Sequence, residues 1–263
     1  MNNVKLAIVN GEGLTLAEVL GEERACLIYN KAYNDGDAIR LELEEPGFCQ
    51  IRLEDSMLPA PVYIKGKAAF TIPFGEKRQA YSPKSFTGDT HMITARLLTS
   101  SEISARRNLA FNPYDLAGTD GALIYPHASA NIETRGEVVF AARNVIDGIY
   151  ANNGHGAYPY QSWGINRRPD AELRVDFGFP AVLDELVITL RADFPPDNYW
   201  TRAAVAFSGG GAETLNLVKS ALPQTFKIAP VRTEWIVLKN LIKTGDESPF
   251  PALTQLEAWG APQ

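Results

Sequence analysis

The chain has 263 residues, of which 45% are hydrophobic and 21% charged, with a formal net charge of −6 and an isoelectric point near 5.2. This composition is that of a folded globular protein, and the length predicts two domains of ordinary size. The acidic balance argues against nucleic acid and anionic membranes as partners, because both attract surfaces rich in Lys and Arg.

The N-terminus, MNNVKLAIVNGEG, offers only the short apolar run 6–9, which is too short for the core of a signal peptide or for a membrane span. We therefore expect a cytoplasmic protein without membrane insertion, or an extracellular one if a leader has been removed. Cys26 and Cys49 lie in apolar, strand-like segments. They predict buried reduced thiols, with a disulfide only if their strands are neighbours.

Strand patterns dominate the N-terminal part. Ile39, Leu41 and Leu43 alternate with charged residues after an Asn-Asp-Gly turn, which is the period of a half-buried strand. Similar runs, separated by Pro- or Gly-containing breaks, follow at 51–53, 62–65, 68–72 and 91–98. Only 15–20, with apolar residues on one helical face, predicts a short helix. The spacing predicts an antiparallel β-sandwich over residues 1–104.

Strand patterns continue in the second half at 186–190, 204–207, 215–217, 235–241 and 253–259. The segment before Asn108 shows no clear alternation, so we place the domain boundary near residue 104 and a second domain at 105–263. The predicted fold class is all-β, with two antiparallel, jelly-roll-like sandwiches packed against one another and less than about a fifth helix.

The stretch 140–178 carries several motifs in a fixed order: Asn144-x-x-Asp147-Gly148, a Gly/Asn/Tyr-rich loop, Trp163, and an alternating strand that ends in Asp-Phe-Gly. Asn-Leu-Ala precedes them at 108–110, and an aromatic-Gly pair closes the chain at 259–260. This order resembles the discoidin, or coagulation factor type C, domain, the galactose-binding-like β-sandwich found in family-32 carbohydrate-binding modules. The resemblance covers roughly residues 105–263 and implies lectin-like carbohydrate binding rather than catalysis.

The resemblance also implies a structural calcium ion at Asp147. The family usually places a Glu near that ion, five residues before the closing Gly, where this chain has Gln255. A neutral amide contributes less to a hard cation than a carboxylate does. With or without a cation, Asp147 is expected to cap its own turn through its side chain.

Catalytic signatures are sparse. The three histidines, His91, His127 and His155, lie outside HExxH, GxSxG and CxxC contexts, and nothing marks a nucleophile. We therefore expect a non-enzyme. Two alternatives stay open: a carbohydrate-active enzyme with its site in the N-terminal domain or at the junction, indicated by convergent carboxylates or a histidine cluster, and a protein-interaction scaffold.

Sugar recognition needs aromatic faces for the C–H side of the ring and planar groups that bond to hydroxyls. Two loops of the C-terminal half concentrate both kinds of residue: His155, Tyr158, Tyr160, Asn166 and Arg167 in the first, and Arg191, Asp193, Asp197 and Trp200 in the second. We predict a glycan or small sugar as the ligand of these loops. Core packing is an equal interpretation of Trp200, and an Arg191 ion pair with Asp193 or Asp197 is an equal interpretation of those residues. The sequence identifies neither the sugar nor the oligomeric state.

Overall fold

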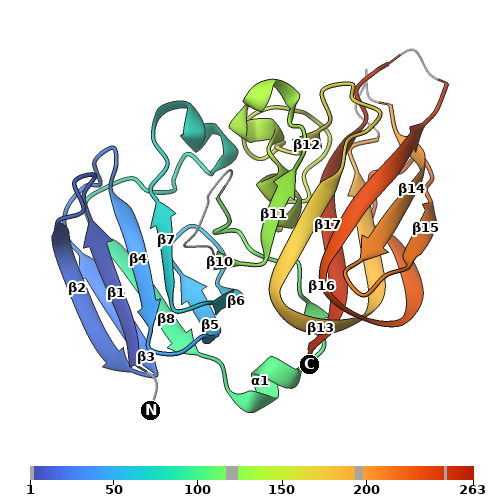
Figure 1. Ribbon diagram of the computed structural model, residues 1–263. Coiled ribbons are helices and arrows are strands. Elements are labelled where there is room, and N and C mark those ends of the chain that lie inside the picture. The colour runs from blue at the N-terminus through green and yellow to red at the C-terminus, as the bar shows by residue number, and fades with distance from the viewer. Residues whose placement is uncertain (1–2, 117–123, 193–197, 246–247) are drawn as a thin grey trace.

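The computed structural model describes residues 3–116, 124–192, 198–245 and 248–263 (Figure 1). Two antiparallel β-sandwiches lie side by side, the N-terminal one in blue to cyan and the C-terminal one in green to red. Within those residues the only α-helix is α1 (Ser100–Ser104), so the predicted all-β fold class is confirmed. None of the described helices is long and apolar enough to span a membrane.

The N-terminal sandwich consists of two sheets, with strand orders β2-β1-β4-β7 and β10-β6-β5-β8-β3. Side chains alternate between its core and solvent, as in β4, where Ile39, Leu41 and Leu43 are all buried. The strands are β1 (Asn3–Val9), β2 (Thr15–Glu22), β3 (Arg24–Tyr29), β4 (Ala38–Leu43), β5 (Gly47–Arg52), β6 (Ala60–Ile64), β7 (Lys67–Thr71), β8 (His91–Leu97) and β10 (Ile124–Tyr125). The 3-10 helix η1 (Gly75–Ala80) follows β7.

The helix predicted at 15–20 is wrong, because these residues form β2. The strand pairs antiparallel with β1, with Val19 opposite Leu6 and Leu20 opposite Lys5. Pairing along the whole of β1 outweighs the weak local preference of a short segment. Helix α1 lies instead in the segment without alternation, where Thr99 and Glu102 form a capping box that the sequence shows as Thr-x-x-Glu.

The cysteine prediction is correct for one residue only. Cys49 is buried on β5, whereas Cys26 is exposed on β3, and both are free thiols. Strands β3 and β5 flank β8 on opposite sides, so the two cysteines do not lie on neighbouring strands.

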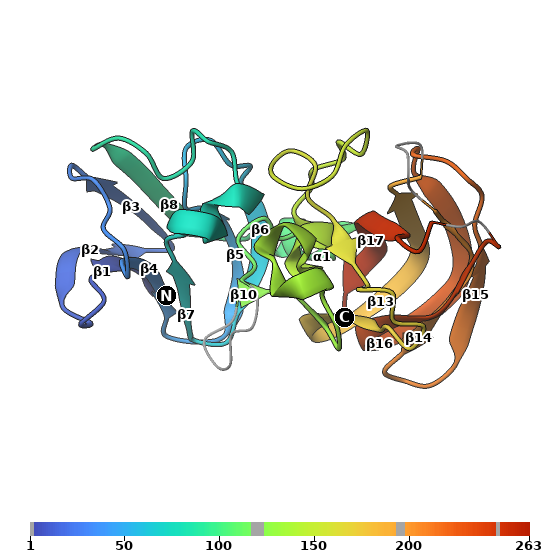
Figure 2. The ribbon, with the colours of Figure 1, turned by 90° about the horizontal axis from the view of Figure 1, so that it is seen from above.

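The C-terminal sandwich is one curved sheet system that wraps around its core (Figure 2). Its path runs β12-β17-β13-β16-β14-β15, with β11 on β13 and β9 on β17. Register shifts within the long strands, such as the one between Asp176 and Ala181, allow β13 and β16 to bend while they stay paired. The elements are β9 (Arg107–Asn108), β11 (His127–Ala130), η2 (Thr134–Gly136), η3 (Val138–Phe140), η4 (Ala142–Ile146), β12 (Trp163–Gly164), β13 (Leu173–Leu190), β14 (Trp200–Phe207), β15 (Ala212–Asn216), β16 (Gln224–Lys243) and β17 (Ala252–Pro262).

The segment between the sandwiches contributes to both of them. Strand β9 pairs with β17, but Tyr114 is buried in the N-terminal core and donates its hydroxyl to Leu58 O at 2.9 Å, and β10 pairs with β6. Phe179 of β13 packs edge-on against Phe48, with ring centroids 4.7 Å apart. These contacts join the two halves closely, as predicted, while the boundary at residue 104 stays a prediction.

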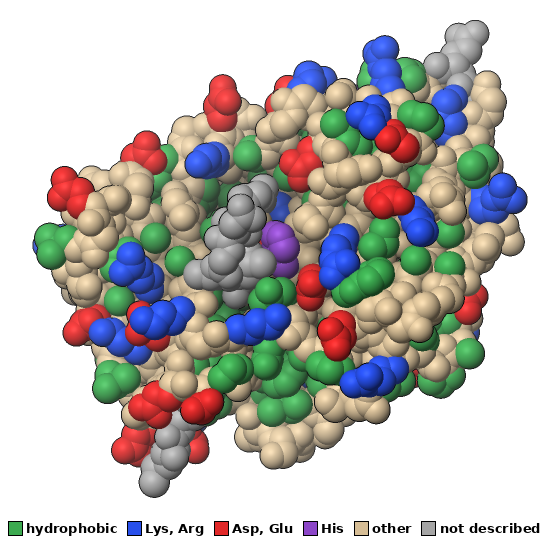
Figure 3. All heavy atoms as spheres, viewed as in Figure 1, with side chains coloured by type: hydrophobic (Ala, Val, Ile, Leu, Met, Phe, Trp, Pro, Cys, Tyr) green, Lys and Arg blue, Asp and Glu red, His purple; other side chains and the backbone are tan. Residues whose placement is uncertain are grey.

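Acidic and basic side chains are interspersed over the face seen in Figure 3. Several are paired: Arg106 with Asp184 at 2.6 Å, and Arg96 with Glu102 at 2.7 Å. The expectation that nucleic acid is not a partner stays a prediction.

Candidate functional site

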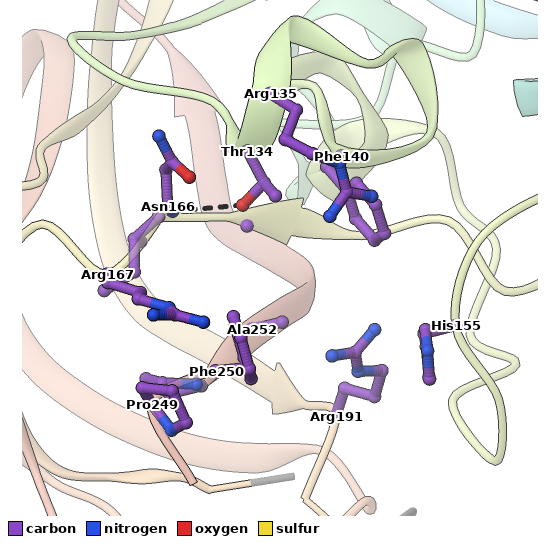
Figure 4. A pocket seen from close by; sticks show the side chains of 13 residues that line it. Thr134, Arg135, Phe140, His155, Asn166, Arg167, Arg191, Pro249, Phe250 and Ala252 are labelled. Atoms are coloured by element: carbon purple, nitrogen blue, oxygen red, sulfur yellow. Dashed lines mark hydrogen bonds between the residues drawn. The ribbon is translucent and has the colours of Figure 1, made fainter. Parts of the chain in front are cut away.

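A cavity of about 210 Å³ opens at one end of the C-terminal sandwich (Figure 4). Four segments far apart in the sequence line it: the turn around η2 and η3, the long loop that surrounds β12, the residue that follows β13, and the segment that leads into β17. The lining residues are Thr134, Arg135, Phe140, His155, Gly164, Ile165, Asn166, Arg167, Arg191, Pro249, Phe250, Pro251 and Ala252.

A tight turn places Asn166 and Arg167 at the cavity. Both residues have left-handed backbone angles, with φ of 47° and 63°, and the turn is closed by the Arg168 N–H, which donates to Ile165 O at 2.9 Å. Asn166 N also donates to Thr134 Oγ1 at 3.0 Å, which ties the turn to η2 (Figure 4). Two successive left-handed residues are typical of tight two-residue turns, where Asn is tolerated better than Arg. The turn therefore holds Arg167 in place at a conformational cost.

The aromatic rings at the cavity each have an arginine beside them. The Arg167 guanidinium lies 4.6 Å from the centroid of the Phe250 ring, and that of Arg135 lies 5.4 Å from Phe140. Phe140 is buried, whereas Phe250 is 38% exposed. Phe250 is thus the aromatic side chain at this cavity that offers surface to a ligand.

Burial and charge at the cavity disfavour the protonated form of its histidine. Arg191, which directly follows β13, is buried, and it points into the same space as His155 (Figure 4). Burial and the positive charge of Arg191 lower the pKa of His155. A neutral imidazole has one donor and one acceptor nitrogen, whereas Arg supplies donors only. The cavity therefore combines both kinds of hydrogen-bonding group with an apolar ring.

Of the residues predicted for ligand binding, His155, Asn166, Arg167 and Arg191 line this cavity. Tyr158 and Tyr160 lie elsewhere on their loop. Tyr158 N donates to Gln79 O of the N-terminal sandwich at 2.7 Å, and the Tyr160 ring packs over Gly154 so closely that a Cβ there would lie 2.9 Å from it.

The ligand-stacking role considered for Trp200 is wrong. Its side chain is fully buried, and its ring centroid lies 6.2 Å from that of Trp163 in the core. Trp163 itself lies in the core and donates its indole N–H to Ile132 O at 3.0 Å. Asp193 and Asp197 lie outside the described residues.

Sequence reasoning missed the two phenylalanines of the cavity. Phe250 stands between Pro249 and Pro251 just before the closing strand, so an aromatic residue in a Pro-flanked loop was an available signal. Phe140 lies in a 3-10 segment without periodicity, and no local pattern distinguishes it from a core residue.

The predicted metal-site residue, Asp147, is enclosed by other parts of the protein. Asp147 is buried, and its Oδ1 accepts from Ile149 N at 2.9 Å, so the predicted turn cap is confirmed. Its Oδ2 accepts from Gln161 Nε2 at 2.8 Å. Burial raises the pKa of Asp147 to about 6, although the charge of Arg143 and these hydrogen bonds act in the opposite direction.

The donor set beside Asp147 does not fit a hard cation. Gln255 Nε2 lies 2.8 Å from Asp147 Oδ1 and 2.7 Å from Asn144 O, so N–H groups face these oxygens. Calcium requires six to eight oxygen ligands. Among the residues that the structure describes, no group of three or more His, Cys, Asp or Glu side chains is placed to hold a metal ion.

Neither a protein-family model nor a curated protein matches this chain. Solved structures do match its fold in part. The family-32 carbohydrate-binding module of C. perfringens NanJ, in complex with galactose, is 20% identical and covers 50% of this chain and 91% of its own, with a TM-score of 0.38. Chitosan-binding module 1 of a Paenibacillus sp. IK-5 chitosanase/glucanase is 14% identical and covers 59% and 99%, with a TM-score of 0.41.

The lectin domain of lectinolysin, complexed with Lewis B antigen, is 14% identical and covers 59% of this chain and 97% of its own, with a TM-score of 0.43. All three are binding modules or lectin domains of the kind that the sequence resembles.

The junction between the sandwiches contains a second cavity, of about 180 Å³. Its lining includes the polar side chains of Lys77, Tyr81 and Arg143. Within the described part of the chain, no carboxylate lines it. Asp115 and His127 also form a pair, with Asp115 Oδ1 2.7 Å from His127 Nδ1. Because Asp115 Oδ2 also accepts from Ala128 N, this carboxylate stabilises the local backbone. The convergent carboxylates that would favour a glycosidase are not found among these residues.

Proposed function

We propose that the protein binds glycans without catalysis, through the cavity at Phe250. The observation that carries this proposal is the convergence of four predicted polar residues from separate segments, His155, Asn166, Arg167 and Arg191, around an exposed aromatic ring. A sugar presents an apolar C–H face and a rim of hydroxyls, and these groups complement a ring and a set of donors and acceptors.

The size of the cavity limits the ligand. At about 210 Å³ it is smaller than the roughly 300–1,000 Å³ of pockets that enclose a drug-sized ligand. We therefore propose that one terminal sugar residue enters, with the rest of the glycan outside.

A glycan array with the intact protein tests this function, because it needs no prior choice of sugar. Phe250→Ala should weaken binding of any positive glycan about fivefold or more, since aromatic contacts of this kind contribute on the order of 1 kcal/mol. Tyr158→Ala is a matched control: Tyr158 is 37% exposed and Phe250 38%, but Tyr158 lies outside the cavity.

Unchanged affinity in a folded Phe250→Ala protein would place the sugar site elsewhere. The absence of binding to every glycan of a broad array would remove the proposal and leave the protein-interaction scaffold as the next hypothesis.

A further inference from the structure

The carboxamide of Gln255 has an unusual set of contacts in the interior of the C-terminal sandwich. Its Nε2 lies 2.7 Å from Asn144 O, 2.8 Å from Asp147 Oδ1 and 2.7 Å from Thr254 O. Three oxygens, one of them on a carboxylate, thus converge on a single nitrogen. The Gln255 side chain is only 2% exposed, so water does not separate these groups.

The orientation of this amide is fixed by its other end. Gly148 N donates to Gln255 Oε1 at 3.0 Å. If the amide were turned over, two N–H donors would face each other there, and its carbonyl oxygen would face the three converging oxygens. The chain therefore directs the N–H groups, and not the oxygen, at the cluster.

Converging buried oxygens repel one another unless a positive group lies between them. We propose that the Gln255 carboxamide does this in place of a metal ion, so that the sandwich is complete without calcium. The amide joins the η4 turn to β17 across more than a hundred residues of sequence, which is the connection that a structural cation would make. The proposal is independent of the sugar cavity.

A single substitution should reverse the arrangement. In Gln255→Glu a second carboxylate faces Asp147, and a divalent cation would relieve the repulsion between two buried like charges. Asn144 O and Thr254 O, which lie 2.7 Å from Gln255 Nε2, would supply further oxygen ligands. The variant should therefore bind calcium where the parent chain does not.

The experiment uses the intact protein, its metal content after purification, and its Tm in EDTA and in excess calcium. For the parent we expect no bound metal and the same Tm in both conditions. Gln255→Glu should have a lowered Tm in EDTA that calcium raises by several degrees, because a ligand of the native state stabilises it by mass action. Gln255→Met, which has neither charge nor N–H, should have a lowered Tm that calcium leaves unchanged.

Three results would overturn the proposal: stoichiometric calcium in the purified parent, a parent Tm that rises with calcium, or a folded Gln255→Glu that is indifferent to the ion. A Gln255→Glu chain that stays unfolded in excess calcium also contradicts it, because the oxygens would then have failed to accept the ion.

Discussion

Two groups of side chains in the C-terminal sandwich contain similar residue types but differ in burial. In the interior, Asn144 and Asp147 make hydrogen bonds within the protein, and the ring of Trp200 is fully buried. At the Phe250 cavity the ring is partly exposed, and Asn166, Arg167 and Arg191 line the space beside it. The comparison shows that residue type alone does not distinguish a core residue from one that lines a cavity. The burial of each side chain and its contacts do.

Replacing an aromatic residue in each group should give the largest contrast. Trp200→Ala should lower the free energy of unfolding by about 3–5 kcal/mol, because it leaves a cavity in the core. Phe250→Ala should lower it by no more than about 1 kcal/mol, since part of that ring already lies in solvent. Urea unfolding of the two variants measures both values. Equal losses would show that Phe250 is a packing residue.

A pair of asparagines provides the next contrast. Asn144 Nδ2 donates to Val138 O at 2.9 Å and to Ser162 O at 3.2 Å, and both bonds are lost in Asn144→Ala. We expect a loss of at least about 2 kcal/mol, because two hydrogen bonds are lost and the Ser162 carbonyl loses this donor in a buried site. Asn166→Gly keeps the left-handed backbone and removes only a cavity side chain, so stability should change by less than about 0.5 kcal/mol while glycan affinity falls.

Two histidines should separate stability from binding by pH. The pKa of His127 is raised: burial lowers it, but the hydrogen bond and charge of Asp115 outweigh that effect. Burial also raises the pKa of Asp115, against the influence of His127. A raised native pKa means that the contribution of His127 is fully present below about 6.5 and is lost as the pH rises through its native value. Stability should therefore decline above neutral pH in the parent, and less so in His127→Gln.

Glycan affinity should depend on pH in a lower range than stability does. The pKa of His155 is lowered by burial and by Arg191, so most His155 side chains are neutral above about pH 6.5. Glycan affinity should be constant there and change only at lower pH. Titrations of affinity and of urea unfolding over the same pH range test both statements, and an affinity that follows the stability curve would contradict the separation.

The smallest expected effect concerns the strained turn. Arg167→Gly removes the guanidinium and relieves the left-handed conformation, whereas Arg167→Ala removes the guanidinium and keeps the strain. The Gly variant should be more stable than the Ala variant by about 0.5–1 kcal/mol. Both should alter glycan affinity to the same extent, because both uncover the same face of Phe250.

Alternation in the sequence was sufficient to predict the strands that bury one face, such as β4 and the N-terminal part of β13. In β13, Leu173, Val175 and Phe177 are all fully buried. It failed at β2, whose exposed Leu20 gave the segment a false helical face. Strand β2 lies at the edge of its sheet. Its pairing with β1 decides the conformation, and a local pattern contains no information about the partner.

The sequence by itself determined the all-β class and the Asp147 turn, because both depend on residues close together in the chain. It also named four of the polar residues that line the cavity. Only the tertiary structure decided that Trp200 is core, that Phe250 and not Tyr160 faces the cavity, and that Gln255 meets Asn144 and Asp147. Those three outcomes depend on which loops and strands become neighbours once the sheet has curved. Which loops and strands become neighbours is decided by long-range strand pairing and by the burial that this pairing produces.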